Sequence, residues 1–141
     1  MNILLAVDGS SCSQRAVDYA IAHGASLRAA PHLHLLHVHP PIPIGRVQSH
    51  IGHDTLQGYY REESETQLAD ARRRLDAAGV AFSVHIHVGL PGELIARLAT
   101  DLDCGLIIMG THGRGGLASV CLGSVAAKVL HLAQCPLLLV K

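Results

Sequence analysis

Short apolar segments alternate with helix-type segments along the whole of this 141-residue chain. Each apolar segment is rich in Val, Ile and Leu and ends in Gly, Pro, Asp or Ser, which is typical of strands. Strands that alternate with helices at this spacing predict an α/β fold, with an open, mostly parallel sheet and helices on both faces. The expected strands are Asn2–Val7, His32–His39, Val80–Val88, Gly105–Met109 and Pro136–Val140.

Two of the predicted elements have clear limits. In Val80–Val88 apolar and polar residues alternate, so this strand has one wetter face and is expected at an edge of the sheet. The second helix is expected to begin near Leu56 and to end at Gly79, where a glycine cap fits.

Composition sets limits on the class of protein. With 49% hydrophobic residues, the chain is long enough for one domain, residues 1–141, and too short for two. Eleven basic residues balance eleven acidic ones, so no nucleic-acid partner is indicated. No apolar run approaches the ~20 residues of a membrane helix, the first residues do not form a leader, and the four cysteines form no CxxC pair. We expect a cytoplasmic protein with reduced thiols and no membrane contact.

The segment from Gly110 to Ser124 lies between an expected strand and an expected helix. We expect Gly110 and Gly113 to allow positive φ angles and close approach of a ligand, because glycine has no Cβ. Gly123 and Ser124 are expected to offer unpaired N–H groups, a hydroxyl and the positive end of a helix dipole. The segment therefore predicts a phosphate-binding loop.

Three distant parts of the chain are expected to meet beside this loop. In open parallel sheets, ligands bind beyond the carboxyl ends of the strands, where the strand order reverses. Asp8, Val38 and Gly110 all lie at such ends. The aperiodic segment from Pro40 to about Thr55 is long enough to lie over or near the same site.

These residues resemble the universal stress protein family over essentially the whole chain. The family's nucleotide signature is Gly, two residues, Gly, nine residues, Gly, then Ser or Thr. Gly110, Gly113, Gly123 and Ser124 fit it without a gap. The opening Leu-Leu-Ala-Val-Asp-Gly-Ser, the Leu-His-Val at the end of the second strand and the closing Cys-Pro-Leu-Leu-Leu-Val are also similar to that family.

The resemblance implies a Rossmann-like five-stranded sheet in the order 3-2-1-4-5, with ATP across the ends of strands 1, 2 and 4. It also implies a homodimer formed through Pro136–Val140. Asp8 would contact the nucleotide beside the ribose and phosphates, and Val38 would present backbone groups to adenine, with Met109 at the adenine end. The phosphates would be held by Gly110, Gly113, Gly123, Ser124 and Val125. Arg114 either neutralises phosphate or is simply solvated.

The sequence favours binding of ATP over its turnover. There is no Gly-x-x-x-x-Gly-Lys-Ser/Thr loop, and Lys128 lies one turn into the helix. No catalytic residue is assigned, and any ATPase activity is expected to be weak. Asp8 could hold a phosphate-bound Mg²⁺ ion. We therefore expect a nucleotide-dependent stress-response module with an unidentified regulatory protein partner. A slow metal-dependent hydrolase that uses Asp8 is the first alternative.

Eleven histidines leave a second alternative open. His32 and His34 share one face of the second strand, and His85 and His87 share a face of the third. If these strands are neighbours, the pairs could cluster and bind Zn²⁺ or Ni²⁺ in a nucleotide-free dimeric adaptor. The simpler interpretation is a set of partly exposed or hydrogen-bonded histidines, because no spacing here is a metal signature by itself.

Overall fold

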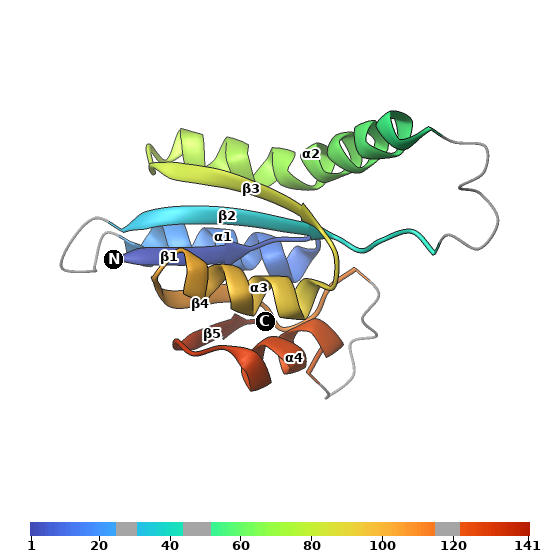
Figure 1. Cartoon of the computed structure of the whole chain (residues 1–141). Helices are drawn as coiled ribbons and strands as arrows, with labels where there is room; N and C mark the ends of the chain where they lie inside the picture. The colour runs from blue at the N-terminus through green and yellow to red at the C-terminus, as the bar shows by residue number, and fades with distance from the viewer. Residues whose placement is uncertain (25–30, 44–51, 115–121) are drawn as a thin grey trace.

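A computed structural model describes residues 1–24, 31–43, 52–114 and 122–141. Within them, five parallel strands form one sheet in the order β3-β2-β1-β4-β5 (Figure 1). The predicted fold class and strand order are confirmed, and the third strand does lie at an edge. The strands are β1 (Asn2–Ala6), β2 (His32–His39), β3 (Phe82–Val88), β4 (Cys104–Gly110) and β5 (Leu137–Val140).

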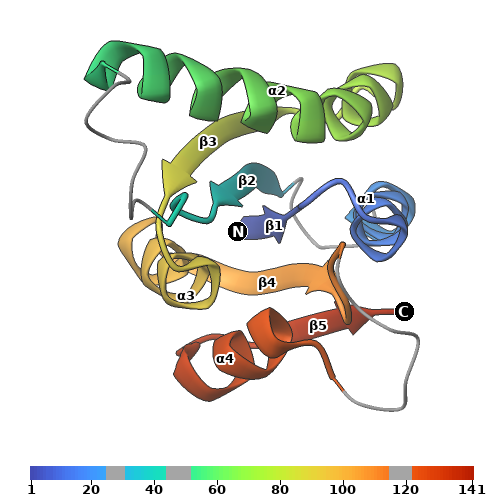
Figure 2. The same cartoon turned by 90° about the vertical axis from the view of Figure 1, so that its right-hand side faces the viewer.

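Helices cover both faces of the sheet and make a three-layer structure (Figure 2). The helices are α1 (Ser11–Gly24), α2 (His53–Ala77), α3 (Pro91–Asp101) and α4 (Ser124–Leu132). Successive strand residues point to opposite faces. Ile3 and Leu5 of β1 therefore pack on the side of α1 and α2, whereas Leu4 packs on the side of α3 and α4. All three are at most 1% exposed, which gives the sheet a core on each face.

The ends of α1 and α2 follow from local sequence. Ser10 caps α1, since its Oγ accepts a hydrogen bond from the Ser13 backbone N–H at 3.2 Å. Gly79 ends α2 in the left-handed region with φ 67°, and Val80 N–H then donates to the Leu75 carbonyl at 3.0 Å. The predicted glycine cap is therefore confirmed. Because Val80 belongs to the cap, β3 begins at Phe82, two residues later than expected.

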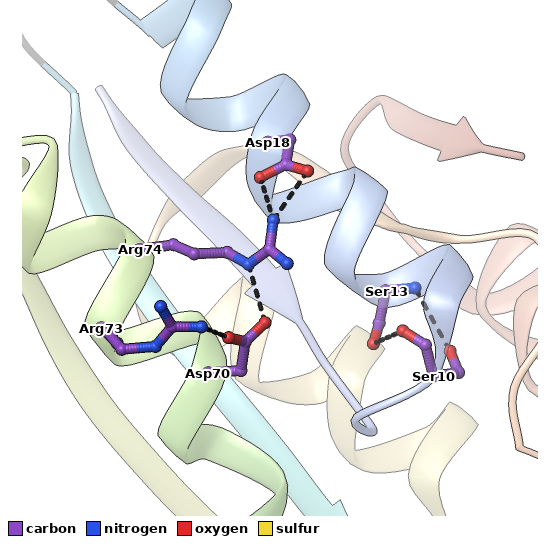
Figure 3. A network of polar contacts seen from close by, with 6 residues as sticks. All are labelled: Ser10, Ser13, Asp18, Asp70, Arg73 and Arg74. Carbon is purple, nitrogen blue, oxygen red and sulfur yellow. Dashed lines mark hydrogen bonds and ion pairs between the residues drawn. The ribbon is translucent and has the colours of Figure 1, made fainter.

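The two helices on one face are joined by an ion-pair network (Figure 3). Arg74 of α2 donates from Nη1 to both carboxylate oxygens of Asp18 in α1, at 2.7 and 2.9 Å. Its Nε donates to Asp70 at 2.7 Å, and Arg73 also pairs with Asp70. These hydrogen bonds, that of Arg74 foremost, lower the pKa of the Asp70 carboxyl. The network fixes α2 beside α1.

α2 begins at His53, three residues before the expected start. Its N-terminal part projects past the carboxyl ends of β2 and β3 (Figure 1). This projecting part therefore lies beside the space beyond the carboxyl ends of the strands. None of the described helices combines the length and the hydropathy that crossing a membrane requires. Cys12, Cys104 and Cys135 are free thiols, as expected.

Candidate functional site

A cavity of about 830 Å³ lies at the carboxyl ends of β1, β2 and β4. Its walls also include the start of α4 and the projecting part of α2. The structure brings all nine residues predicted for the site into the lining of this one cavity. They are Asp8, Val38, Met109, Gly110, Gly113, Arg114, Gly123, Ser124 and Val125.

Asp8, which lines this cavity, links two loops. Its Oδ1 accepts a hydrogen bond from Ser10 N–H at 3.0 Å, and its Oδ2 accepts one from Arg114 N–H at 3.2 Å. The first bond closes the turn after β1, and the second fastens the loop after β4. Each carboxylate oxygen can accept more than one hydrogen bond, so Asp8 can still accept one from a ligand or a metal-bound water.

Other protein atoms lie close to each of the three signature glycines. A Cβ at Gly110 would lie 2.7 Å from Cys12 Cβ and 3.0 Å from Ser13 N of α1. A Cβ at Gly113 would lie 2.6 Å from Asp8 Oδ2, and one at Gly123 would lie 2.9 Å from the Thr111 carbonyl oxygen. None of the three is among the described residues with positive φ. The expectation of positive φ at Gly110 and Gly113 is therefore wrong, because these glycines serve close approach of protein atoms.

The start of α4 supplies the donors expected of an anion site, with one correction. Gly123 N–H is not unpaired, because it donates to the Thr111 carbonyl at 2.9 Å. That bond holds the N-terminus of α4 against the end of β4. The N–H groups of Ser124, Val125 and Ala126 have no intrahelical acceptor, and no described side chain caps this end. These donors and the helix dipole face the cavity.

Other parts of the cavity lining are apolar and aromatic. Val38 and Met109 are 8% and 6% exposed, and they line the cavity together with Ile95 in the same buried cluster as Ala126 of α4. The Tyr60 ring packs on His39, with ring centroids 4.9 Å apart, and Tyr60 Oη accepts a hydrogen bond from Ile42 N–H at 3.0 Å.

Tyr59, next to Tyr60 in α2, is the tyrosine that lines the described cavity, and it leaves 48% of its surface exposed. Sequence reasoning did not place Tyr59 or Glu63 in the site. The sequence did offer one signal, because residues four apart in a helix lie on the same face and Tyr59 and Glu63 have this spacing.

Charged groups bridge α2 to the loop after β4. Arg114 Nη2 lies 3.7 Å from Glu63 Oε1, and the same oxygen accepts a hydrogen bond from Gln67 Nε2 at 3.2 Å. Gln67 in turn lies against Gly9, whose φ of 79° and lack of Cβ make room for it. Nearby, buried His37 donates from Nδ1 to the Val7 carbonyl at 2.8 Å. Burial lowers the pKa of His37, although that hydrogen bond acts in the opposite direction.

The histidines of β2 and β3 do come together, but without forming a metal centre. His34 Nδ1 lies 3.0 Å from His85 Nε2, and His32 Nε2 lies 2.8 Å from Ser83 Oγ. In the part of the chain that the structure describes, no three His, Cys, Asp or Glu side chains are arranged to hold a metal ion. Desolvation and the neighbouring histidines lower the pKa of both His34 and His85.

A parallel sheet with this strand order and a cavity at the carboxyl ends of β1, β2 and β4 defines a Rossmann-like α/β protein. Comparisons with known proteins are more specific. The profile of the universal stress protein family matches residues 1–141. The chain belongs to this family.

Relatives and solved structures agree with this assignment. Universal stress protein Sll1388 of Synechocystis is 30% identical over 150 residues, covering 99% of this chain and 96% of the relative. Universal stress protein MJ0531 of Methanocaldococcus jannaschii is 29% identical over 139 residues, covering 99% and 81%. The solved structure of protein MJ0577 superposes with a TM-score of 0.85 at 30% identity and covers 99% of this chain and 94% of its own.

Some solved members of the fold carry ligands. A universal stress protein solved in complex with cAMP superposes with a TM-score of 0.72 at 24% identity, covering 100% of this chain and 97% of its own. An Arabidopsis thaliana member solved with AMP superposes with a TM-score of 0.69 at 17% identity, covering 100% and 91%. At these identities the superpositions establish a shared fold.

Proposed function

We propose that this protein binds an adenine nucleotide, with ATP as the physiological ligand, and acts as a cytoplasmic regulatory module of the stress response. One observation carries the proposal: a single cavity is lined both by the backbone N–H donors of a helix start and by apolar and aromatic side chains. A nucleotide has the matching polarity, with an anionic phosphate end and a flat apolar base. Related folds solved with cAMP and AMP support this choice of ligand class.

The residues divide between the two ends of the ligand. Ser124 and Val125 N–H groups would bind phosphate, and the Ser124 hydroxyl adds a further donor. Val38 and Met109 would contact the base from below. Asp8, between the two ends, would accept a hydrogen bond from the ribose or from the first shell of a metal ion.

The donor set near the phosphates fits Mg²⁺. Mg²⁺ keeps several of its waters and needs only one or two carboxylates beside the phosphates of its nucleotide. Asp8 lines the cavity and retains acceptor capacity on both oxygens. The ion would neutralise phosphate charge, and Asp8 would orient its waters.

Binding without appreciable turnover fits the side chains around the cavity. Among the described lining residues, the carboxylates are those of Asp8 and Glu63, and both already accept hydrogen bonds from the protein. The described lining contains no lysine. Single-turnover assays with excess protein and radiolabelled ATP should show only slow phosphate release, and a fast burst would favour the hydrolase alternative.

Assembly is the second part of the proposal. β5 is an edge strand, and an exposed edge favours pairing with another strand. We infer a homodimer in which β5 pairs with its twin across a two-fold axis. Nucleotide occupancy would then alter the surface offered to a protein partner.

Two measurements test nucleotide binding. Mass spectrometry of small molecules released from freshly purified protein should find ATP or AMP, and calorimetric titration of the stripped protein should give saturable binding of both. Retention of a transition metal together with an absence of nucleotide binding would instead favour the adaptor alternative. Binding of neither would remove the proposed function.

A further inference from the structure

We propose that Glu63 of α2 makes this cavity select nucleotides by charge, so that it accepts a monophosphate or a Mg²⁺-neutralised triphosphate and disfavours a bare triphosphate. The inference rests on the proposed function and deepens it, because it assigns a specificity-determining residue on a helix that lies outside the glycine signature.

The charges around the cavity do not suit a bare triphosphate. Its described lining carries two carboxylates, of Asp8 and Glu63, and one guanidinium, of Arg114. The start of α4 adds the equivalent of about half a positive charge. Burial lowers the pKa of His37, which keeps that imidazole neutral near pH 7. Among the carboxylates, the guanidinium and the helix start of the described lining, negative charge therefore balances or exceeds positive charge before any ligand enters.

Glu63 also reduces the attraction that Arg114 could offer. Its Oε1 lies 3.7 Å from Arg114 Nη2, so the guanidinium already has a counter-charge. A phosphate that approaches Arg114 meets the field of Glu63 at nearly the same point. Repulsion of this kind grows with the charge on the phosphate chain, so it is weakest for a monophosphate.

The position of Glu63 is fixed by its surroundings. Gln67, one turn further along α2, donates to Oε1 at 3.2 Å and itself rests on Gly9 of the turn after β1. Tyr60, one turn earlier, is 5% exposed and is anchored to Ile42. These contacts keep Glu63 beside the cavity. Because its side chain is only 33% exposed, solvent ions screen its charge only in part.

The test compares three variants of one helix. Glu63→Gln removes the charge at the cavity, Glu63→Asp keeps it, and Glu62→Gln removes the same charge at the adjacent exposed residue, which does not line the cavity. Affinities for ATP with EDTA, ATP with Mg²⁺, and AMP are measured by calorimetry at pH 8 and low salt. At that pH ordinary imidazoles are neutral. Circular dichroism checks that each variant is folded.

Glu63→Gln should tighten the binding of metal-free ATP by about 5- to 10-fold and change AMP binding by less than about twofold. Glu63→Gln should also reduce the increase in ATP affinity that Mg²⁺ produces in the wild-type protein. Glu62→Gln and Glu63→Asp should behave as wild type, and added salt should shrink the effect. If Glu63→Gln misfolds, a Glu63→Asp variant that loses the discrimination would overturn the inference, and one that keeps it would support it.

The outcomes separate the two proposals. If wild-type protein binds AMP and ATP but Glu63→Gln matches Glu62→Gln, charge selection by Glu63 is overturned while nucleotide binding stands. If wild-type protein binds no nucleotide under any of these conditions, the proposed function fails and the selectivity falls with it.

Discussion

The Asp8 carboxylate occupies the space that a side chain at Gly113 would need. A Cβ there would lie 2.6 Å from Asp8 Oδ2, the oxygen that also accepts a hydrogen bond from Arg114 N–H. The loop after β4 therefore rests on the end of β1. This contact gives the second signature glycine a structural reason that holds whether or not a ligand is bound.

Gly113→Ala should displace that loop from Asp8 and lower the affinity for AMP and ATP by about tenfold or more, because phosphate ligands must be placed within a fraction of an ångström. Calorimetric titration measures the change. Gly58→Ala is the matched control: a Cβ at Gly58, an exposed position of α2, meets nothing within 4 Å. Unchanged nucleotide affinity in Gly113→Ala would show that nucleotide binding does not depend on the contact between this loop and Asp8.

Gly110→Ala should act on stability rather than on the ligand. The Cβ would press on the Cys12 carbonyl carbon at 2.9 Å and on Ser13 N at 3.0 Å, both backbone atoms of α1 that cannot rotate away. Overpacking of this kind costs about 1–3 kcal/mol. Urea unfolding followed by circular dichroism measures the free energy of unfolding relative to wild type. Gly58→Ala should instead gain about 0.5–1 kcal/mol, because alanine favours a helix interior. A loss below about 0.5 kcal/mol would mean that α1 shifts to make room.

Much of the fold could be predicted because its signals are local. Apolar segments, the Gly79 cap and the alternation in β3 each depend on neighbouring residues. In a parallel sheet the carboxyl ends of all strands lie at the same end of the sheet. This rule brings Asp8, Val38 and Gly110 together there.

The glycines could not be interpreted in the same way. Their neighbours, Cys12, Asp8 and Thr111, belong to contacts formed only after folding, most of them with a distant part of the chain.

The contribution of α2 to the site was missed for a related reason. A helical stripe reveals which face is buried against the sheet, but not how far the helix projects beyond it. Tyr59 and Glu63 belong to the N-terminal half of α2 and line the cavity, so their role depends on where α2 lies along the sheet, which contacts such as Arg74 with Asp18 help to set. That placement is a tertiary property.

Stability should fall as the pH drops below about 6.5, the ordinary pKa of histidine. Desolvation lowers the pKa values of His34, His37 and His85 in the folded protein, so the unfolded chain binds more protons in this range. Their contribution is complete above pH 6.5 and is lost as the pH falls through the lower folded values. Urea midpoints at pH 7.5, 6.5 and 5.5 measure this.

A His34→Gln/His85→Gln double variant should show a shallower loss of stability over the same pH range. The exposed His131→Gln variant, on α4, serves as the control for the loss of an imidazole elsewhere. Equal slopes in all three proteins would mean that the His34 and His85 pair does not set the pH dependence.

The proposed dimer makes a prediction about backbone groups of β5. Pro136 and Val140 carbonyls accept hydrogen bonds from Ile107 and Thr111, so they point toward β4. Backbone groups alternate in direction along a strand, and those of Leu139 therefore face the free edge. Leu139→Pro should remove an edge donor while it spares the ladder with β4. Sedimentation velocity should show a monomer.

Leu139→Ala is the control for that experiment, because it loses the same side chain but keeps the N–H. It should remain dimeric. Dimers in both variants, or monomers in both, would argue that the β5 edge does not carry the association.

Tyr59 should stack on the base of a bound nucleotide. It lines the apolar side of the cavity with 48% of its surface exposed, beside His39 and the buried Tyr60. The chain has three tyrosines and no tryptophan, so tyrosine emission reports directly on this contact. AMP should quench the emission of wild-type protein. Tyr59→Leu should lose most of the quenching and weaken AMP binding about tenfold, since base–aromatic stacking contributes ~1–3 kcal/mol.

Two further variants make the Tyr59 experiment decisive. Tyr59→Phe keeps the ring and should bind AMP as wild type does. Tyr19→Leu removes a tyrosine of similar exposure on α1, outside the described cavity lining, and should keep the quenching. It also corrects for light absorbed by the nucleotide, which is the same in every sample. Equal quenching in Tyr59→Leu and wild type would place the base elsewhere in the cavity, away from the Tyr59 ring.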